Sequence, residues 1–145
     1  TALAYIDYSQ QELAVAAFFS GDIKMQEAYQ SGDFYLSFAK MAGAAPACAT
    51  KGTHGAIRDQ FKTVALGVLY GLSAEGLARS LGLPIFRGKE LLRLHQATFP
   101  TFWKWSQAIG DHAILSGKLQ TVLGWNLHVD RNPNLRSLCN FPMHR

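Results

Sequence analysis

The stretch "AIRDQFKTVALGVLYG", residues 56–71, decides the fold because two patterns run through it at helical spacing. Apolar residues recur every three or four positions and predict one buried face of a helix over residues 56–70. That face consists of Ile57, Phe61, Val64, Ala65 and Val68. On another side, a slanting stripe at intervals of four residues consists of Arg58, Lys62, Leu66 and Tyr70.

The stripe begins basic and ends aromatic, and two interpretations of it stay open on spacing alone. In one, it is a solvated helix face that carries a half-buried Tyr70. In the other, Arg58 and Lys62 bind phosphate oxygens as charge-assisted donors, while Tyr70 offers its ring or hydroxyl to a base or sugar.

Turn and capping signals divide the rest of the chain into further short elements. Two "SGD" triplets, Pro84 and Pro100 mark helix entries. We predict helices over residues 10–19, 23–30, 33–42, 74–81, 85–98 and 101–116, with a last short helix near Leu135. Residues 117–129, "GKLQTVLGWNLHV", alternate about a glycine and predict a β-hairpin, and residues 1–6, "TALAYI", suit a buried strand. The fold class is therefore mainly α with a small β component (α+β).

Two acidic residues lie at the junction between this predicted strand and the first helix, in "YIDYSQQELAVAAFF", residues 5–19. Asp7 or Ser9 can cap the helix, with Glu12 near the positive end of its dipole. Alternatively, an acid at the carboxyl end of a strand holds a divalent cation such as Mg²⁺. These residues alone leave both interpretations open.

Bulk properties indicate one ordinary globular domain. The chain has 145 residues, of which 48% are hydrophobic and 17% charged, so it is not a disordered tail. A net charge of +4 is compatible with a polyanionic partner. There is no apolar run of spanning length and no secretion signal, and Cys48 and Cys139 lie far apart without a partner motif. We therefore expect reduced thiols, no membrane partner and a cytoplasmic location.

Three blocks of the sequence resemble, in order, the motifs of the family A DNA polymerases, the DNA polymerase I group. They are "DYSQQEL" (residues 7–13), "GAIRDQFKTVALGVLYG" (55–71) and "RSLCNFPM" (136–143). The resemblance implies template-directed addition of deoxynucleoside monophosphates from dNTPs to a primer 3′-end by two-metal-ion transfer. It implies primer-template DNA and dNTP as partners and two Mg²⁺ ions as cofactors. It also implies one partial domain of a right-hand polymerase, with a palm strand and helix over about 1–20, fingers helices over about 21–116, and a return to the palm over about 117–145.

The resemblance also implies roles for individual residues. Asp7 would be catalytic and would hold the metal ions with a backbone carbonyl of Tyr8, and Lys62 would be catalytic at the triphosphate. Glu12, paired with Tyr70 under the sugar, would exclude a 2′-hydroxyl group. The implied nucleotide-binding residues are Tyr8, Gln10, Glu12, Arg58, Lys62, Leu66 and Tyr70. The implied DNA-binding residues are Tyr70, Gly71, Arg136, Asn140 and His144.

The chain also departs from the family pattern. The family's second catalytic carboxylate motif is absent, as are the thumb and the remaining palm segments, so we expect the isolated chain to be inactive. Leu66 stands where the family usually has an aromatic residue, Tyr35 where it usually has His, and His144 where it usually has Gln. The alternatives are a fragment of a single-subunit RNA polymerase, against which Glu12 argues, and a non-catalytic DNA-binding helical module.

Overall fold

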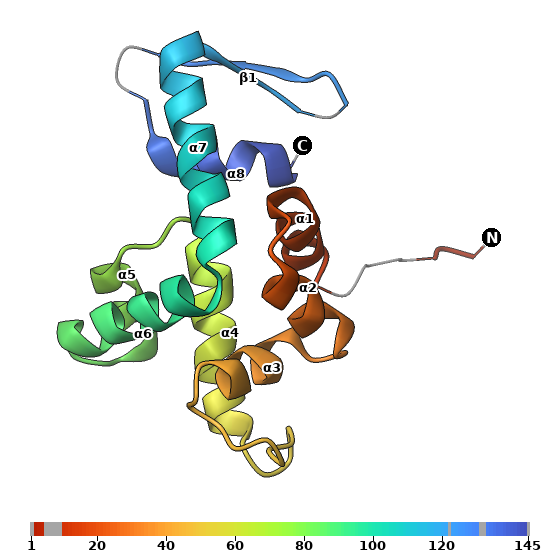
Figure 1. Cartoon of the computed structure of the whole chain (residues 1–145), viewed down its shortest axis with the longest axis vertical. Coiled ribbons are helices and arrows are strands. Elements are labelled where there is room, and N and C mark those ends of the chain that lie inside the picture. Colours follow the sequence, from red (N-terminus) through yellow and green to blue (C-terminus); the bar gives the residue numbers. More distant parts are fainter. Residues whose placement is uncertain (1, 5–9, 122, 131–132, 145) are drawn as a thin grey trace.

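The protein is mainly helical in the computed structural model, which describes residues 2–4, 10–121, 123–130 and 133–144 (Figure 1). The helices are α1 (Gln11–Ser20), α2 (Ile23–Gln30), α3 (Phe34–Met41), α4 (Gly55–Leu69), α5 (Ala74–Leu81), α6 (Ile85–Thr98), α7 (Pro100–Ser116) and α8 (Leu135–His144). Strands β1 (Lys118–Gln120) and β2 (Asn126–His128) pair antiparallel, with Leu119 opposite Leu127. The predicted class, mainly α with a small β component, is confirmed.

Local signals explain why the predicted and observed helix bounds agree so closely. Two helices are capped at the predicted "SGD" triplets: the Oδ1 atom of Asp22 accepts from the Met25 amide at 3.0 Å, and that of Asp33 accepts from the Leu36 amide at 3.2 Å. The Ser73 hydroxyl caps a third helix by accepting from the Gly76 amide at 3.2 Å. The bounds of α2, α5 and α6 match the prediction, and α7 begins one residue earlier, at Pro100.

Asp22 caps two helices at once. The residue is 2% exposed, and its Oδ2 atom accepts from the backbone amide of Phe102 at 3.0 Å, in the first turn of α7. The first amides of any helix lack intrahelical acceptors and carry partial positive charge. One buried carboxylate therefore satisfies the starts of both α2 and α7.

The main core surrounds α4. Its predicted apolar face is buried at Phe61, Val64, Ala65 and Val68. The α4 helix contacts α1, α3, α5 and α6. Across the α3–α4 contact, the rings of Phe38 and Phe61 meet edge-on with centroids 4.7 Å apart. A smaller cluster of Ala113, Leu119 and Leu138 joins α7, the hairpin and α8 at the other end of the molecule (Figure 1).

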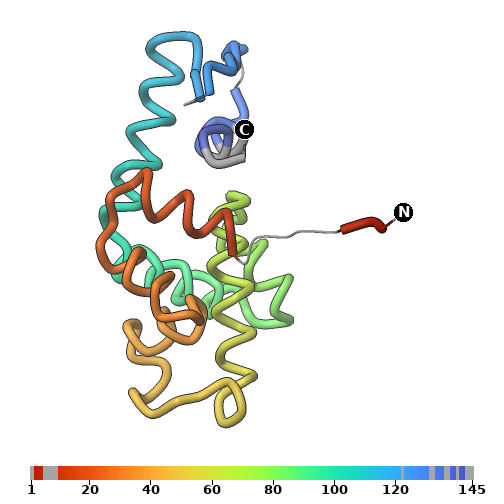
Figure 2. The backbone as a smooth tube through the Cα atoms, turned by 90° about the vertical axis from the view of Figure 1, so that its right-hand side faces the viewer, coloured from red at the N-terminus to blue at the C-terminus, as the bar shows by residue number. Residues whose placement is uncertain are grey.

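The strand predicted over residues 1–6 is wrong for residues 2–4, which are exposed and irregular. They lie away from the helices in two perpendicular views (Figures 1 and 2). A strand needs a neighbouring strand for its backbone hydrogen bonds. Within the described residues, β1 and β2 pair only with each other, so no sheet is available to residues 2–4.

Two further sequence expectations concern cysteines and membrane spans. Cys48 and Cys139 are both free thiols. Among the helices of the described residues, none combines the length and the apolar character needed to cross a membrane.

His95 is a fully buried histidine inside an aromatic cluster. Its ring lies 5.1 Å from that of Phe38 and 5.0 Å from that of Phe99, measured between centroids. The indole Nε1–H of Trp103 donates to His95 Nδ1 at 2.9 Å, so Nε2 carries the proton of the neutral ring. Within the described part of the chain, Nε2 is the buried side-chain nitrogen that has no hydrogen-bond acceptor.

This burial predicts that the protein loses stability in mild acid. Burial lowers the pKa of His95 from its ordinary 6.5 to about 3. Between these pH values, His95 is therefore protonated in the unfolded chain but neutral in the folded protein. The contribution of His95 to stability is therefore complete above the unfolded pKa and declines as the pH falls toward the folded pKa. At about pH 5, the free energy of unfolding should be about 2 kcal/mol lower than at about pH 8, as measured by urea unfolding.

A pair of histidine variants isolates this effect. His95→Gln removes the buried titrating ring and should remove most of the difference between the two pH values. His112→Gln, on the exposed side of α7, should retain it. An unchanged pH dependence in His95→Gln would contradict the assignment.

Candidate functional site

The stripe on α4 begins beside the buried face of that helix and turns away from it toward Tyr70. Lys62 and Tyr70 are exposed, and Arg58 is largely buried, with 15% of its side chain accessible. Leu66 is half-buried and packs against the main core. The stripe therefore presents a basic part near the start of α4 and an aromatic residue just past its end.

Arg58 is fixed by a carboxylate from outside its own helix. Its Nε–H donates to Asp33 Oδ2 at 2.6 Å, and its Nη1 atom lies 3.5 Å from Asp59 Oδ1. The hydrogen bond with Asp33 raises the pKa of the Arg58 guanidinium above its ordinary value. Arg58 is thus permanently charged and held at one edge.

One aromatic ring lies beneath both basic groups of the stripe. The Cζ atom of Arg58 lies 5.3 Å from the centre of the Tyr35 ring, and the Nζ atom of Lys62 lies 6.0 Å from it. Such stacking of cations over a ring face is favourable. Burial raises the pKa of the Tyr35 hydroxyl, and the charge of Arg58 opposes this shift only in part. Tyr35 therefore remains a neutral platform under two positive charges.

The aromatic end of the stripe joins the first turn of α1. The Tyr70 hydroxyl donates to Glu12 Oε1 at 3.1 Å, across 58 residues of sequence. Partial burial and this hydrogen bond raise the pKa of Tyr70 above its ordinary value. A carboxylate and a phenol are thus locked together beside α4.

This arrangement suits an elongated ligand with an anionic end. Lys62 and Tyr70 are eight residues apart, which corresponds to about 12 Å along a helix. Arg58 and Lys62 can donate charge-assisted hydrogen bonds to an anion such as a polyphosphate. Glu12 and Tyr70, already bonded to each other, can pack against an uncharged ring at the other end.

Several residues singled out by the sequence cannot be placed in the site. Asp7 and Tyr8 lie outside the described residues, as do the side chains of Arg136, Asn140 and His144 on α8. The described residues contain no group of three or more acidic, histidine or cysteine side chains that could hold a metal ion.

The two remaining predicted residues flank helices α1 and α4. Gln10 precedes α1 with a left-handed backbone and makes no side-chain cap to the helix. Gly71 follows Tyr70 and also has a positive φ of 69°, a conformation that glycine adopts without strain. Whether either residue contacts a ligand stays a prediction.

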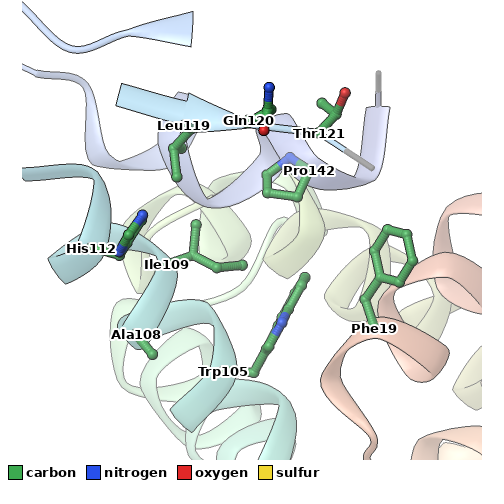
Figure 3. A pocket seen from close by; sticks show the side chains of 9 residues that line it. All are labelled: Phe19, Trp105, Ala108, Ile109, His112, Leu119, Gln120, Thr121 and Pro142. Atoms are coloured by element: carbon green, nitrogen blue, oxygen red, sulfur yellow. The ribbon is translucent and has the colours of Figure 1, made fainter. Parts of the chain in front are cut away.

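An apolar pocket of about 470 Å³ lies elsewhere, between the end of α1, α7, β1 and α8. Figure 3 shows Phe19, Trp105 and Pro142 around its space. Among the described residues that line it there is no carboxylate, lysine or arginine, and none of them belongs to the stripe. The basic end of the stripe on α4 therefore suits an anionic ligand better than this pocket does.

Two residues of the basic end were missed as site residues. Asp33 gave a capping signal, but its second oxygen meets a residue 25 positions away, which no local pattern reveals. Tyr35 stood out only as a departure from a family pattern. The sequence signal available for Tyr35 was its position two residues after the capping residue Asp33.

Comparison with known proteins identifies the family. The family profile described as "DNA polymerase family A" matches residues 1–140. The thermostable DNA polymerase I of Thermus thermophilus is 30% identical over 139 residues, which are 94% of this chain and 16% of that protein. DNA polymerase I of Chloroflexus aurantiacus is 35% identical over 120 residues, which are 81% of this chain and 12% of that protein.

A solved structure gives the same result in three dimensions. It is described as "POL domain of Pol1 from M. smegmatis complex with DNA primer-template and dNTP" and superposes with a TM-score of 0.79 at 28% identity. The match covers 94% of this chain and 25% of that one. The chain spans a small part of the length of these relatives, but the family profile covers nearly all of the chain itself. This chain therefore belongs to DNA polymerase family A.

Proposed function

We propose that these residues are the fingers and part of the palm of a DNA-directed DNA polymerase. The complete polymerase would add deoxynucleoside monophosphates from dNTPs to a primer 3′-end and would work in the cytoplasm. Family membership favours this reaction over that of a single-subunit RNA polymerase. The similar solved structure is a complex with primer-template DNA and dNTP, which supports the same substrates here.

The hydrogen bond between Tyr70 and Glu12 carries the proposal. At 3.1 Å, it occupies one oxygen of Glu12 and holds the carboxylate against the phenol. A deoxyribose packed on this pair needs no hydrogen-bond partner at its 2′ position. A 2′-hydroxyl would meet an acceptor already in use and a space already filled, which selects deoxynucleotides.

The triphosphate would bind at the basic end of the stripe. Arg58 and Lys62 would donate to its oxygens and stabilise the charge that develops there during transfer. Leu66, between the two ends, would pack against the sugar. Gln10 would contribute to the same nucleotide site from the start of α1.

The metal requirement rests on Asp7 and Tyr8 of the first sequence block. The Asp7 carboxylate and the Tyr8 carbonyl would hold two Mg²⁺ ions together with the triphosphate, because hard oxygen ligands suit this cation. When bound, these ions would activate the primer hydroxyl and stabilise the leaving pyrophosphate. A second carboxylate besides Asp7 is needed for this chemistry, so the 145 residues alone would bind substrates without transfer.

DNA would be contacted from both halves of the chain. Tyr70 and Gly71 would face the template beside the nucleotide, and Arg136, Asn140 and His144 would present α8 to the primer and template. Residues of about 1–20 and 117–145 would form the palm part, and those of about 21–116 the fingers.

Glu12→Ala in the complete polymerase tests the deoxynucleotide site. Removing the carboxylate should raise the ratio of ribonucleotide to deoxynucleotide kcat/KM by about tenfold or more, because the obstruction at the 2′ position disappears. Steady-state incorporation of matched ribo- and deoxynucleotide pairs measures the ratio. Glu27→Ala, which removes an exposed acid on α2, should leave it unchanged. An unaltered ratio in Glu12→Ala would place the discrimination elsewhere.

A further inference from the structure

Both carboxylate oxygens of Asp33 accept hydrogen bonds, one from its own helix α3 and the other from an arginine on α4. Oδ1 accepts the Leu36 amide and caps α3, whereas Oδ2 accepts the Arg58 Nε–H at 2.6 Å. The side chains of Arg58 and Asp33 are 15% and 28% exposed. The cap fixes the carboxylate on α3, so the carboxylate in turn fixes the arginine on α4.

This contact uses one edge of the guanidinium, in a side chain that is 15% accessible. A guanidinium carries five N–H donors, and Asp33 uses the single one on Nε. The Cζ atom lies over the Tyr35 ring, 5.3 Å from its centre, so the ring is a second contact that restrains the side chain. A long arginine side chain loses considerable rotamer freedom when it binds, and less of that loss remains when two contacts already hold it.

Resting on the nucleotide site proposed above, we propose that Asp33 is a positioning residue for the incoming triphosphate. It holds Arg58 over the Tyr35 ring, beside Lys62, in the orientation that the phosphates require. Asp33 itself does not touch the nucleotide.

Charge repulsion alone and positioning of Arg58 predict opposite changes in nucleotide binding when the Asp33 carboxylate is removed, so the direction of the change tests the proposal. A carboxylate near a binding site for an anion repels that anion, so removal of the charge alone should tighten binding. If Asp33 acts by positioning Arg58, its removal should weaken binding instead. The pair is partly exposed, so solvent screens the repulsion and positioning dominates.

Asp33→Asn in the complete polymerase separates the two effects. Asparagine caps helices about as well as aspartate, so α3 should be preserved. We expect the KM for dNTP to rise about tenfold with a smaller change in kcat and an unchanged thermal midpoint. Asp33→Ser also caps a helix but is too short to reach Arg58, and it provides a second variant with the same expectation.

Asp59→Asn is the matched control. Asp59 also faces Arg58, but its side chain is 75% exposed and its Oδ1 atom lies 3.5 Å from Nη1, without a hydrogen bond. Its removal deletes the same charge beside the same guanidinium without releasing the arginine. The KM for dNTP should therefore stay the same or fall slightly.

Arg58→Ala distinguishes failure of this inference from failure of the nucleotide site. If Arg58→Ala leaves the KM unchanged, the triphosphate role of Arg58 is wrong, and the positioning role falls with it. If Arg58→Ala raises the KM while folded Asp33→Asn and Asp33→Ser do not, only the positioning role is overturned. If Asp33 acts through Arg58, adding Asp33→Asn to Arg58→Ala should have no further effect on the KM.

Discussion

Replacing Lys62 with alanine in the complete polymerase should slow nucleotide incorporation by about two to three decades. Lys62 is exposed on α4, and its ammonium lies 6.0 Å above the Tyr35 ring, so truncation removes little core packing. What it removes is a charge-assisted contact to the reacting triphosphate, worth about 2–4 kcal/mol of transition-state stabilisation. Single-turnover incorporation of one dNTP measures the loss directly.

Arg93→Ala is the control for charge alone. Arg93 is exposed on α6, outside the stripe, and its removal changes the net charge by the same amount. Salt screens a surface charge that lies away from the reacting groups, so the rate should stay nearly constant. Similar losses in the two variants would remove Lys62 from the triphosphate site.

Replacing Gly88 with alanine should destabilise the fold by about 3 kcal/mol. A Cβ atom at this position of α6 would lie 2.2 Å from the carbonyl oxygen of Ala74 and 2.9 Å from the Cβ of Ala78, both on α5. Alanine is favoured over glycine within a helix by about 1 kcal/mol, but a clash with backbone is larger and cannot be relieved by a rotamer change. The thermal midpoint should fall by roughly 6–12 °C.

Gly55→Ala provides the matched comparison for Gly88→Ala. Gly55 is the first residue of α4, and an added Cβ would meet nothing within 4 Å. This substitution should be neutral or slightly stabilising through helix propensity. If both variants unfold at the same denaturant concentration as the original chain, the close approach of α5 and α6 is not a constraint.

Helix positions could be predicted from sequence because the determining signals are local. Asp22, Asp33 and Ser73 precede the helices that they cap, and Pro84 immediately precedes α6. Each signal acts over three or four residues, which is the range of the hydrogen bonds it satisfies. The strand over residues 1–6 failed for residues 2–4 because strands depend on distant partners, which composition does not supply.

Spacing in the sequence predicted only the part of the candidate site that lies on α4. The i, i+4 spacing placed Arg58, Lys62, Leu66 and Tyr70 on one stripe, but it did not reveal that Arg58 is ion-paired to Asp33 or that Leu66 packs on the core. The pairing of Glu12 with Tyr70 came from family resemblance, because 58 residues separate them. Contacts between helices depend on how the helices pack, and no single helix encodes that.

The buried carboxylate of Asp22 couples the starts of α2 and α7. Its two oxygens accept amides from residues that are 77 positions apart, Met25 and Phe102, and the residue is 2% exposed. Opening either helix start would leave one oxygen of this buried carboxylate without its hydrogen-bond donor, which is costly. Local opening that exposes the start of α7 should therefore expose the start of α2 as well, so we expect these two helix starts to lose order together.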